Sequence, residues 1–395
     1  MKTLKDYNLE GKKVLVRVDF NVPLDDNLKV IDDSRIEGAK PTIDYIIAHG
    51  GTVILMSHLG RPKNKEDKFS LKHIVPAVEK VVGKEVKFVA DSIGPEVEKA
   101  VAELKKGDIL LLENVRYYKE EEAGDKDFAK SLADLGDFYV NDAFGTAHRA
   151  HASTAIIADY FPNDKAFGLL LEKEIGSIEK VLKDSKKPVT AVLGGSKVSS
   201  KITVIENILD KIDHMIVGGG MTFTFIKALG GNIGNSLCED DKLDLALEIL
   251  AAAKKKNVQV HLPVDVVIAD SFSNDANTKT VAVGEIPEGW QGLDAGKKSL
   301  AEIKEVILAS KTILWNGPLG VFEMENFSNG TKELGKYIAE ATANGAFSLV
   351  GGGDSVAAVK EFKFQDKVSY VSTGGGAMLE MLEGKSLPGI DAILK

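Results

Sequence analysis

Short, almost continuous apolar runs alternate with longer segments of helical period throughout this chain of 395 residues. Such runs, when helices separate them, are typical of parallel strands that are buried on both faces of a sheet. The predicted strands are Val14–Asp19, Thr52–Ser57, Asp108–Glu113, Phe138–Asn141, Pro188–Leu193, His214–Val217, Val258–Leu262, Lys311–Trp315, Phe347–Val350 and Val368–Val371. The predicted helices cover residues 34–49, 70–82, 93–105, 126–135, 198–210, 240–256, 299–309, 328–343 and 354–360. The pattern predicts an α/β fold with parallel sheets covered on both faces.

The length exceeds what one hydrophobic core usually supports, so two domains are expected. Between the two groups of strands, the segment 168–187 carries leucine and isoleucine at helical spacing and ends in charged residues before Pro188. This segment is either a helix that joins two lobes or an ordinary surface helix within one lobe. Periodicity alone does not separate the two interpretations.

Composition disfavours several classes of protein. The net charge of −9, without a basic tail or stripe, argues against general nucleic-acid binding. No run approaches the roughly 18 apolar residues of a membrane span, and the first residues lack the apolar segment of a secretory signal. The single cysteine, Cys238, fits a reducing compartment. A cytoplasmic protein is expected.

All five arginines lie within the first 149 residues, whereas every other Lys/Arg position is a lysine. Arginine presents a planar fork of donors that grips phosphate or carboxylate in a bidentate way. Arg17 falls inside a predicted strand, and the others lie at or near element ends: Arg35, Arg61, Arg116 and Arg149. Scattered retention in a lysine-preferring lineage would give the same count. The positions favour a site for a small, highly anionic ligand in the first half.

Unusual polar clusters follow the predicted strands of the first half, where open parallel sheets bind their ligands. They are Asp19-Phe20-Asn21-Val22-Pro23, His58-Leu59-Gly60-Arg61-Pro62, Glu113-Asn114-Val115-Arg116 and Asn141-Asp142-Ala143-Phe144-Gly145, the last running on to His148-Arg149-Ala150-His151. Each alone is also typical of a turn, and a single histidine is usually structural. Four such clusters at one sheet edge predict an anion pocket.

Glycine-rich clusters follow the strands of the second half. They are Gly194-Gly195-Ser196-Lys197-Val198-Ser199-Ser200-Lys201, Gly218-Gly219-Gly220, Gly351-Gly352-Gly353-Asp354-Ser355 and Ser372-Thr373-Gly374-Gly375-Gly376. Glycine lets backbone N–H groups approach a phosphate, and a following helix N-terminus adds a positive dipole end. Lys197 and Lys201 are expected on one face of a helix that starts there, and Asp354 is a candidate Mg²⁺ ligand. Tight turns alone also require glycine, but the lysines and the carboxylate favour a nucleotide site.

Better-known nucleotide motifs are missing. Gly384-Lys385-Ser386 has Leu379 where a Walker A loop needs its first glycine. No complete dinucleotide fingerprint follows a strand, and the H-R-D loop of protein kinases is not found. A catalytic Asp base is required when a hydroxyl acceptor must lose a proton. Its absence is natural for an acceptor that is already ionised, such as a carboxylate or a phosphate.

Taken in order, six stretches closely resemble the phosphoglycerate kinase family. They are Val16-Arg17-Val18-Asp19-Phe20-Asn21-Val22-Pro23, Ser57-His58-Leu59-Gly60-Arg61-Pro62, Ala147-His148-Arg149-Ala150-His151, Gly194-Gly195-Ser196-Lys197-Val198, Trp315-Asn316-Gly317-Pro318-Leu319-Gly320-Val321-Phe322-Glu323 and Gly351-Gly352-Gly353-Asp354-Ser355. The resemblance covers almost the whole chain.

This resemblance implies two doubly wound, Rossmann-like lobes. Residues 1–170 with the tail 376–395 are expected to bind phosphoglycerate, 171–187 to form the connecting helix and 188–375 to bind nucleotide. The implied reaction is reversible transfer of the acyl phosphate of 1,3-bisphosphoglycerate to ADP, giving 3-phosphoglycerate and ATP. Transfer is expected to be direct and in line after lobe closure, with Mg²⁺, in a monomer that has no nucleic-acid or membrane partner.

The family's site residues carry over position by position. Phosphoglycerate is expected at Asp19, Asn21, Arg35, His58, Leu59, Gly60, Arg61, Arg116 and Arg149. The nucleotide is expected at Gly195, Lys197, Lys201, Gly219, Asn316, Glu323, Gly352, Gly353, Asp354 and Ser355, with Asp354 at Mg²⁺ and Glu323 at the ribose. The phosphoryl group in flight is expected to meet Arg35, Lys197 and the amides of Gly374 and Gly375.

The chain departs from the family at three serines. The family more often has Ala at Ser196, an acidic residue or Gly at Ser200, and Thr at Ser355. None of these removes a charged group with an assigned role. Two alternative functions share parts of this pattern: a catalytically idle nucleotide-binding or scaffold protein, and a different phosphotransferase or sugar-phosphate enzyme. The retained arginines and lysines argue against the first, and the specific stretches argue against the second.

Overall fold

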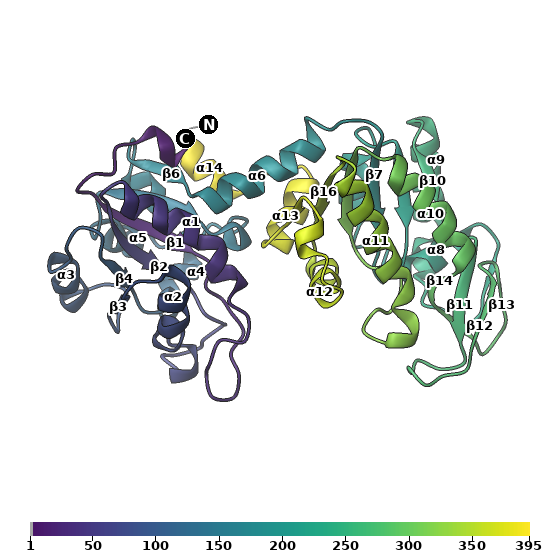
Figure 1. Cartoon of the computed structure of the whole chain (residues 1–395), viewed down its shortest axis with the longest axis horizontal. Helices are drawn as coiled ribbons and strands as arrows, with labels where there is room; N and C mark the ends of the chain where they lie inside the picture. The colour runs from purple at the N-terminus through teal and green to yellow at the C-terminus, as the bar shows by residue number, and fades with distance from the viewer. Residues whose placement is uncertain (1–2) are drawn as a thin grey trace. The chain divides into compact units, whose positions relative to one another are not determined.

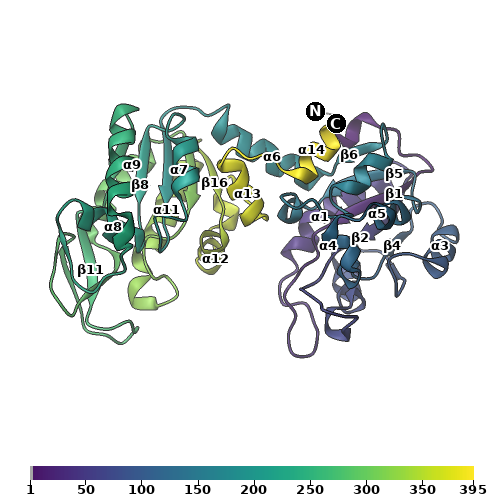
Figure 2. The same ribbon diagram turned by 180° about the vertical axis from the view of Figure 1, so that it is seen from behind.

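The computed structural model describes residues 3–395, which divide into two compact units. The first comprises the chain up to Gly176 together with Ser386–Lys395, and the second comprises Ser177–Lys385. Each unit contains a six-stranded parallel sheet with helices on both faces (Figures 1 and 2). The predicted α/β architecture is confirmed.

The sheet of the first unit is doubly wound. Its order is β3-β4-β2-β1-β5-β6, so the chain starts in the middle, moves to one edge and then returns to the other. The strands are β1 (Lys13–Val18), β2 (Thr52–Met56), β3 (Lys87–Phe88), β4 (Ile109–Leu111), β5 (Phe138–Asp142) and β6 (Lys165–Phe167). All residues of β2, β4 and β5 are buried, because helices cover both faces of the sheet. Each buried aliphatic side chain of such a core contributes about 1.5–3 kcal/mol.

The helices of the first unit lie close to their predicted positions, with two short additions, α4 and α14. They are α1 (Ser34–Ala48), α2 (Val75–Val82), α3 (Pro95–Ala102), α4 (Lys119–Ala123), α5 (Lys126–Ala133) and α14 (Pro388–Leu394). Helices α1 and α2 lie on one face of the sheet and α5 on the other (Figures 1 and 2). α14 belongs to the returning tail, where the Gly389 N–H donates to the Ala147 carbonyl at 2.8 Å. Of the expected tail 376–395, Ser386–Lys395 therefore belong to the first unit, whereas residues 376–385 belong to the second.

The second unit repeats this winding in the order β10-β8-β7-β15-β16-β17. The strands are β7 (Val189–Leu193), β8 (His214–Val217), β10 (Gln259–His261), β15 (Thr312–Asn316), β16 (Phe347–Val350) and β17 (Tyr370–Val371). Its helices are α7 (Ile202–Ile208), α8 (Met221–Ala228), α9 (Leu243–Lys255), α10 (Lys297–Ala309), α11 (Asn329–Ala343), α12 (Gly353–Glu361) and α13 (Gly375–Leu382). Helices α10 and α11 lie on one face, and α7, α8 and α9 on the other (Figures 1 and 2).

Two further small sheets of the second unit were not predicted. An antiparallel sheet joins β12 (Thr278–Ala282), β11 (Asp265–Ala269) and β14 (Gln291–Ala295), and β9 (Asn232–Ile233) pairs with β13 (Glu285–Ile286). β12 is almost entirely exposed, so it lacks the apolar run by which a buried strand is recognised.

The helix α6 (Leu169–Leu182) coincides with the predicted segment 168–187. The boundary between the two units falls inside it, after Gly176, so this helix joins them. Its first turn is held by Asp142 at the end of β5, whose Oδ1 accepts hydrogen bonds from the N–H groups of Leu170 and Leu171 at 3.0 and 3.1 Å. Across residues 3–395, every helix is too short or too polar to cross a bilayer.

Candidate active site

The winding of the first unit creates one natural ligand site. The strand β1 lies between β2 and β5 in the sheet. The chain leaves β1 toward the β2 side and later returns to the β5 side, so the loops after β1 and β5 diverge at the carboxyl edge. Asp19 and Asn21 follow β1, His58–Arg61 follow β2, and the stretch that ends at Arg149 follows β5. The predicted polar clusters therefore meet at the switch point of the sheet.

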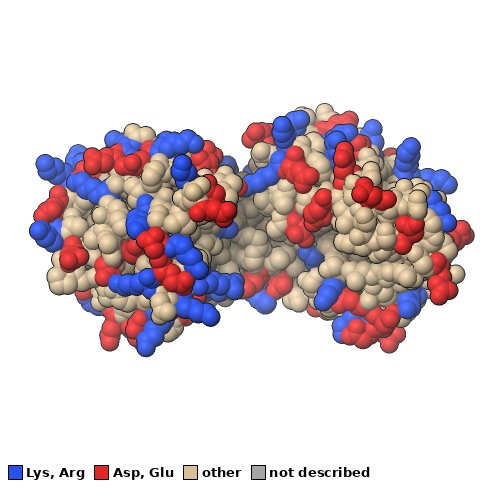
Figure 3. Space-filling model, turned by 90° about the horizontal axis from the view of Figure 1, so that it is seen from below, with Lys and Arg blue, Asp and Glu red and all other residues tan. Residues whose placement is uncertain are grey.

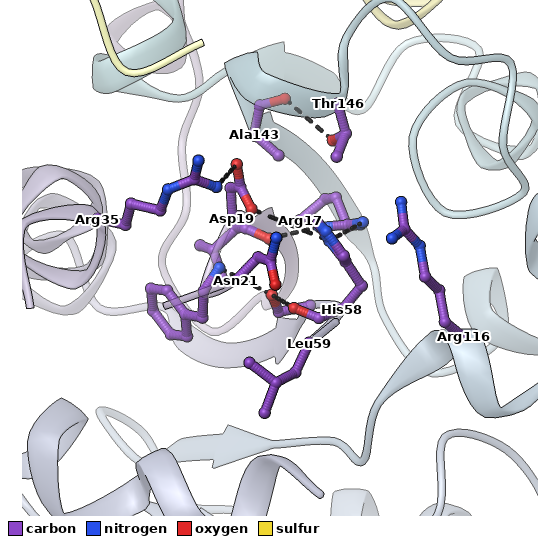
Figure 4. Close-up of polar contacts among 12 residues, drawn as sticks. Arg17, Asp19, Asn21, Arg35, His58, Leu59, Arg116, Ala143 and Thr146 are labelled. Carbon is purple, nitrogen blue, oxygen red and sulfur yellow. Dashed lines mark hydrogen bonds and ion pairs between the residues drawn. The ribbon is translucent and has the colours of Figure 1, made fainter. Parts of the chain in front are cut away.

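Asp19 is central to this group (Figure 4). Its Oδ2 atom accepts a hydrogen bond from Arg35 Nη1 at 2.5 Å, and its Oδ1 atom lies 3.9 Å from Nδ1 of the buried His58. The buried Oδ1 has no hydrogen-bond donor among the described residues. Gly145 leaves room for this ion pair, because a Cβ atom there would lie 2.4 Å from Asp19 Oδ2. The free Oδ1 is thus suited to accept a hydroxyl hydrogen from a ligand.

Arg17 supports this group, although the sequence analysis gave it no place in the site. It is completely buried, its Nε donates to Ser153 Oγ at 2.7 Å, and Nη2 lies 3.3 Å from His58 Nδ1. Ser153 Oγ in turn donates to Oε1 of the buried Glu121 at 2.6 Å. A charged side chain in the middle of an apolar strand was the available signal, since such a residue is almost never buried without a partner.

His58 and His151 are held neutral beside the arginines. Burial, followed by the charges of Arg17, Arg116 and Arg35, lowers the pKa of His58 well below its usual value. Burial and the neighbouring cations, of which Arg116 acts most strongly, lower the pKa of His151 to about 4. Because Arg17 is donor-only, Nδ1 of neutral His58 accepts from it, and the proton resides on Nε2. That N–H is available to an anionic ligand.

The His58 loop is fixed to its neighbours by its backbone. The Gly60 N–H donates to Asn21 Oδ1 at 2.8 Å, and the Gly60 carbonyl accepts from Arg116 Nη1 at 3.0 Å. The Leu59 side chain is buried, so this residue faces the site with its main chain. Arg35 and Arg116 lie on opposite sides of the Asp19–His58 group (Figure 4).

The other two predicted arginines are exposed and lie less tightly in the group. Arg61 and Arg149 have exposed side chains on the loops after β2 and β5. The charge of Arg149 nevertheless acts on Arg116, whose pKa is lowered first by burial, then by Arg17 and, to a smaller extent, by Arg149. The cationic character of the site therefore extends to its exposed rim.

The second unit has a cavity of about 400 Å³ at its own switch point, between the loops after β7 and β15. Four of the residues expected at the nucleotide line it, Gly195, Gly219, Glu323 and Asp354, and so do two exposed apolar side chains outside that set, Leu237 and Phe272. Glycine is required by the close approach of the loops. A Cβ atom at Gly194 would lie 2.1 Å from the Pro318 carbonyl oxygen, and Gly195 has φ +124°.

Asn316 contacts Lys201 and the glycine-rich loop after β16. It is buried, its Oδ1 accepts a hydrogen bond from Lys201 Nζ, and its Nδ2 donates to the Gly351 carbonyl at 2.8 Å. The pKa of Lys201 is lowered, because the effect of burial exceeds the opposing effect of the Asp354 charge. Gly352 has φ +92°, and a Cβ atom there would lie 2.6 Å from Asn316 Nδ2. Ser355 is fully buried, and its hydroxyl accepts from the Gly317 N–H at 2.5 Å, so its side chain serves the loop itself.

The predicted start of the helix over Lys197 and Lys201 is wrong. α7 begins only at Ile202, with Lys201 as its N-cap residue, and Lys197 is exposed on the preceding turn. The serines and glycines of this stretch favour turn geometry over a helical start.

Gly374 is the N-cap of α13, and an added Cβ at Gly375 would be 3.6 Å from the Gly352 Cα and the Gly353 nitrogen. The starts of α12 and α13 thus lie side by side.

Asp354 offers one carboxylate to a divalent cation. Asp354 is exposed in the first turn of α12 and lines the cavity. Within residues 3–395, no group of three or more His, Cys, Asp or Glu side chains could hold a metal by itself. A single carboxylate fits Mg²⁺, which keeps several waters and shares phosphate oxygens with a bound nucleotide.

The general surface does not attract anions. Acidic and basic side chains are interspersed over the surface of each unit on the face shown in Figure 3, and the net charge is −9. A phosphorylated ligand would therefore have to be captured by local positive groups, such as the arginines around Asp19.

Three comparisons relate the chain to known proteins. A family model described as phosphoglycerate kinase matches residues 4–385. The chain is 56% identical to phosphoglycerate kinase of Porphyromonas gingivalis, with 99% of each chain covered. It is 54% identical to the cytosolic phosphoglycerate kinase of Nicotiana tabacum, with 99% of this chain and 97% of the relative covered. Among solved structures, phosphoglycerate kinase from Coxiella burnetii has a TM-score of 0.91 at 42% identity, and that from Pyrococcus horikoshii 0.84 at 30%. Each of these two matches covers 100% of this chain and 98% of the chain in the solved structure.

Proposed function

The chain belongs to the phosphoglycerate kinase family and is a glycolytic kinase that forms ATP from ADP and 1,3-bisphosphoglycerate, and we propose that it divides this task between its two units. The first unit binds phosphoglycerate and the second binds the nucleotide. One observation supports the division: each unit has its own switch point, one surrounded by arginines and the other by glycine-rich loops over a cavity.

In the first unit, recognition of phosphoglycerate rests on charge and on single hydrogen bonds. The exposed rim, Arg61 and Arg149, together with Arg116 and His58 Nε2–H, would hold the phosphate that is not transferred. Asp19 Oδ1 would accept the ligand's hydroxyl hydrogen, since it is buried without a donor. Arg35 would leave its ion pair with Asp19 Oδ2 in part and face the carboxyl or acyl phosphate end.

In the second unit, the loops before α7 and α12 would bind the nucleotide phosphates. Backbone N–H groups at Gly352 and Gly353 and the ammonium of Lys201 supply positive potential. Glu323 is exposed at the cavity wall and would accept hydrogen bonds from the ribose. The apolar side chains Leu237 and Phe272 would cover the base.

Transfer itself needs neither a covalent intermediate nor a base, because the acceptor is an ionised phosphate or carboxylate. Arg35 from the phosphoglycerate side, and Lys197 with the amides of Gly374 and Gly375 from the nucleotide side, would stabilise the charge that spreads over the transferring phosphoryl group. Since the reactants are assigned to different units, in-line transfer requires closure of the two units, which also excludes water from the acyl phosphate.

The bound metal is Mg²⁺ in this proposal. Asp354 would hold it together with nucleotide phosphate oxygens, and the cation would neutralise phosphate charge during transfer. The protein is further proposed to act as a monomer in the cytoplasm, without a nucleic-acid or membrane partner. The relatives named cytosolic support the location.

A coupled assay of ATP formation from 1,3-bisphosphoglycerate and ADP tests this proposal when Mg²⁺ is varied. The Asp354→Asn variant should need a higher Mg²⁺ concentration for half-maximal rate. Asp366→Asn, which changes another exposed carboxylate of the same unit, is the matched control and should leave the requirement unchanged. An unaltered Mg²⁺ requirement in Asp354→Asn would place the metal ligand elsewhere.

A further inference from the structure

The loop that carries Leu59, Gly60 and Arg61 runs out from β2 and returns through a short 3₁₀ turn, Asp67–Phe69. Its two ends come together at Gly60, which has φ +63° and would meet the Phe69 ring if it carried a Cβ atom, at 2.4 Å. A loop of this length has no strand or long helix of its own to fix its shape. Contacts from outside the loop must therefore hold its shape and the position of Arg61.

The side chain of Asn114 joins both ends of this loop. It is fully buried, and its Nδ2 donates two hydrogen bonds, to the Leu59 carbonyl at 2.8 Å and to the Phe69 carbonyl at 2.9 Å. Its Oδ1 accepts from the Arg116 N–H at 3.1 Å. The amide nitrogen and the amide oxygen of Asn114 are therefore both hydrogen-bonded. One side chain thus connects the loop with the backbone of Arg116.

The residues on either side of Asn114 hold the rest of the loop. Tyr117 Oη donates to the Glu66 carbonyl at 2.6 Å, in the outer part of the loop. Glu113 accepts from Ser70 Oγ at 2.6 Å and from the Leu71 N–H at 2.8 Å, just after it. Arg116 itself donates to the Gly60 carbonyl. Residues 113–117, which follow β4, thus hold the loop after β2 in place through hydrogen bonds.

We propose that Asn114 and Tyr117 are positioning residues for phosphoglycerate, because they hold the loop 59–69 in the shape that directs His58, Arg61 and Arg116 toward one ligand. The inference rests on the proposed phosphoglycerate site of the first unit. Neither residue needs to touch the ligand. Their effect is transmitted through the Leu59, Phe69 and Glu66 carbonyls.

The test compares Michaelis constants for the two substrates of ATP consumption, 3-phosphoglycerate and ATP. Asn114→Asp keeps the size of the side chain and the acceptor for Arg116, but it replaces the double donor by an oxygen that faces two carbonyls. Loss of two buried hydrogen bonds should raise the KM for 3-phosphoglycerate by about tenfold or more. The KM for ATP should stay within about twofold, because the nucleotide is assigned to the other unit.

Two further variants make the result specific. Tyr117→Phe removes one hydroxyl and keeps the ring, so it should fold even where Asn114→Asp does not, and it should raise only the KM for 3-phosphoglycerate, by a smaller factor. Ser92→Ala is the matched control, because this buried hydroxyl donates its hydrogen bond to the Glu113 carbonyl at 2.7 Å, at the same strand end, and not to the loop 59–69. It should change neither KM.

Arg61→Ala separates this inference from the proposed function. If Arg61→Ala raises the KM for 3-phosphoglycerate but Asn114→Asp and Tyr117→Phe do not, the site stands and the positioning role is wrong. Equal changes in both Michaelis constants, or an equal effect of Ser92→Ala, would also overturn it, since they would indicate a general loss of structure. If Arg61→Ala has no effect either, the phosphoglycerate site itself is misplaced.

Discussion

Asp142 makes the stability of the first unit depend on pH in a direction that is unusual for a carboxylate. It is fully buried where β5 ends and α6 begins, and burial raises its pKa from 3.8 to about 7 against the effect of its hydrogen bonds. Between pH 4 and pH 7 the folded unit therefore keeps a proton that the unfolded chain has lost. Because the folded state binds more protons in this window, stability must fall as the pH rises.

The size of the effect follows from the two pKa values. The rise from 3.8 to about 7 corresponds to about 4 kcal/mol at 1.36 kcal/mol per pKa unit. This penalty is small at pH 4, grows through the window and is nearly complete at pH 7. Asp142→Asn cannot ionise, so its stability relative to the parent protein should increase by about 3 kcal/mol between pH 4.5 and pH 7.5. Because the stability difference between the two proteins is compared at several pH values, any pH-independent effect of the substitution cancels.

Urea unfolding at four pH values between 4.5 and 7.5 measures this difference. Both tryptophans, Trp290 and Trp315, belong to the second unit, so tryptophan fluorescence follows that unit while far-ultraviolet circular dichroism follows both. Asp294→Asn is the matched control, because Asp294 is a buried carboxylate of the second unit whose pKa burial also raises to about 7. It should alter the fluorescence transition, whereas Asp142→Asn should alter the dichroism and leave the fluorescence transition unchanged. A constant stability difference between Asp142→Asn and the parent across this pH range would refute the argument.

Three further outcomes follow from the proposed mechanism. Arg35→Ala should lower kcat by about 10³-fold or more, since a guanidinium at a transferring phosphoryl group can contribute 10³–10⁵, and near-normal steady-state kinetics would exclude that role. Lys197→Ala should lower kcat with little change in ADP affinity measured by calorimetry, because the ammonium is assigned to the transition state; complete loss of ADP binding would reverse that assignment. Small-angle scattering should show the radius of gyration falling only when both substrates are bound, and a constant radius in an active enzyme would leave closure without support.

The sheets and their ligand edges could be predicted because the local signals were strong. Every predicted strand overlaps a strand of the structure, since runs such as Thr52–Met56 are apolar at every position except the first. Clusters such as His58–Arg61 then fall at the carboxyl edge by geometry alone. The antiparallel strand Thr278–Ala282 escaped, because an exposed strand carries no apolar face. Its pairing depends on contacts between distant residues, which periodicity does not encode.

The predicted site residues were largely those with charge or glycine at strand ends, and the residues that support them were assigned no role. Arg17 and Asn114 are buried, so their importance lies in partners such as Ser153 and the Leu59 carbonyl. Those partners lie 136 and 55 residues away in the chain. The start of α7 was misplaced at Lys197 because spacing alone does not tell a turn from a first helical turn.

The division of the two ligands between the two units is the central claim, and calorimetric titration of 3-phosphoglycerate and of ADP tests it most directly. The measurements use the parent protein, Arg149→Ala and Lys201→Ala. Arg149→Ala should weaken binding of 3-phosphoglycerate and leave ADP affinity unchanged, whereas Lys201→Ala should weaken ADP binding and leave 3-phosphoglycerate affinity unchanged. A variant that weakens both ligands to the same extent, or a reversal of the two patterns, would contradict the assignment of one ligand to each unit.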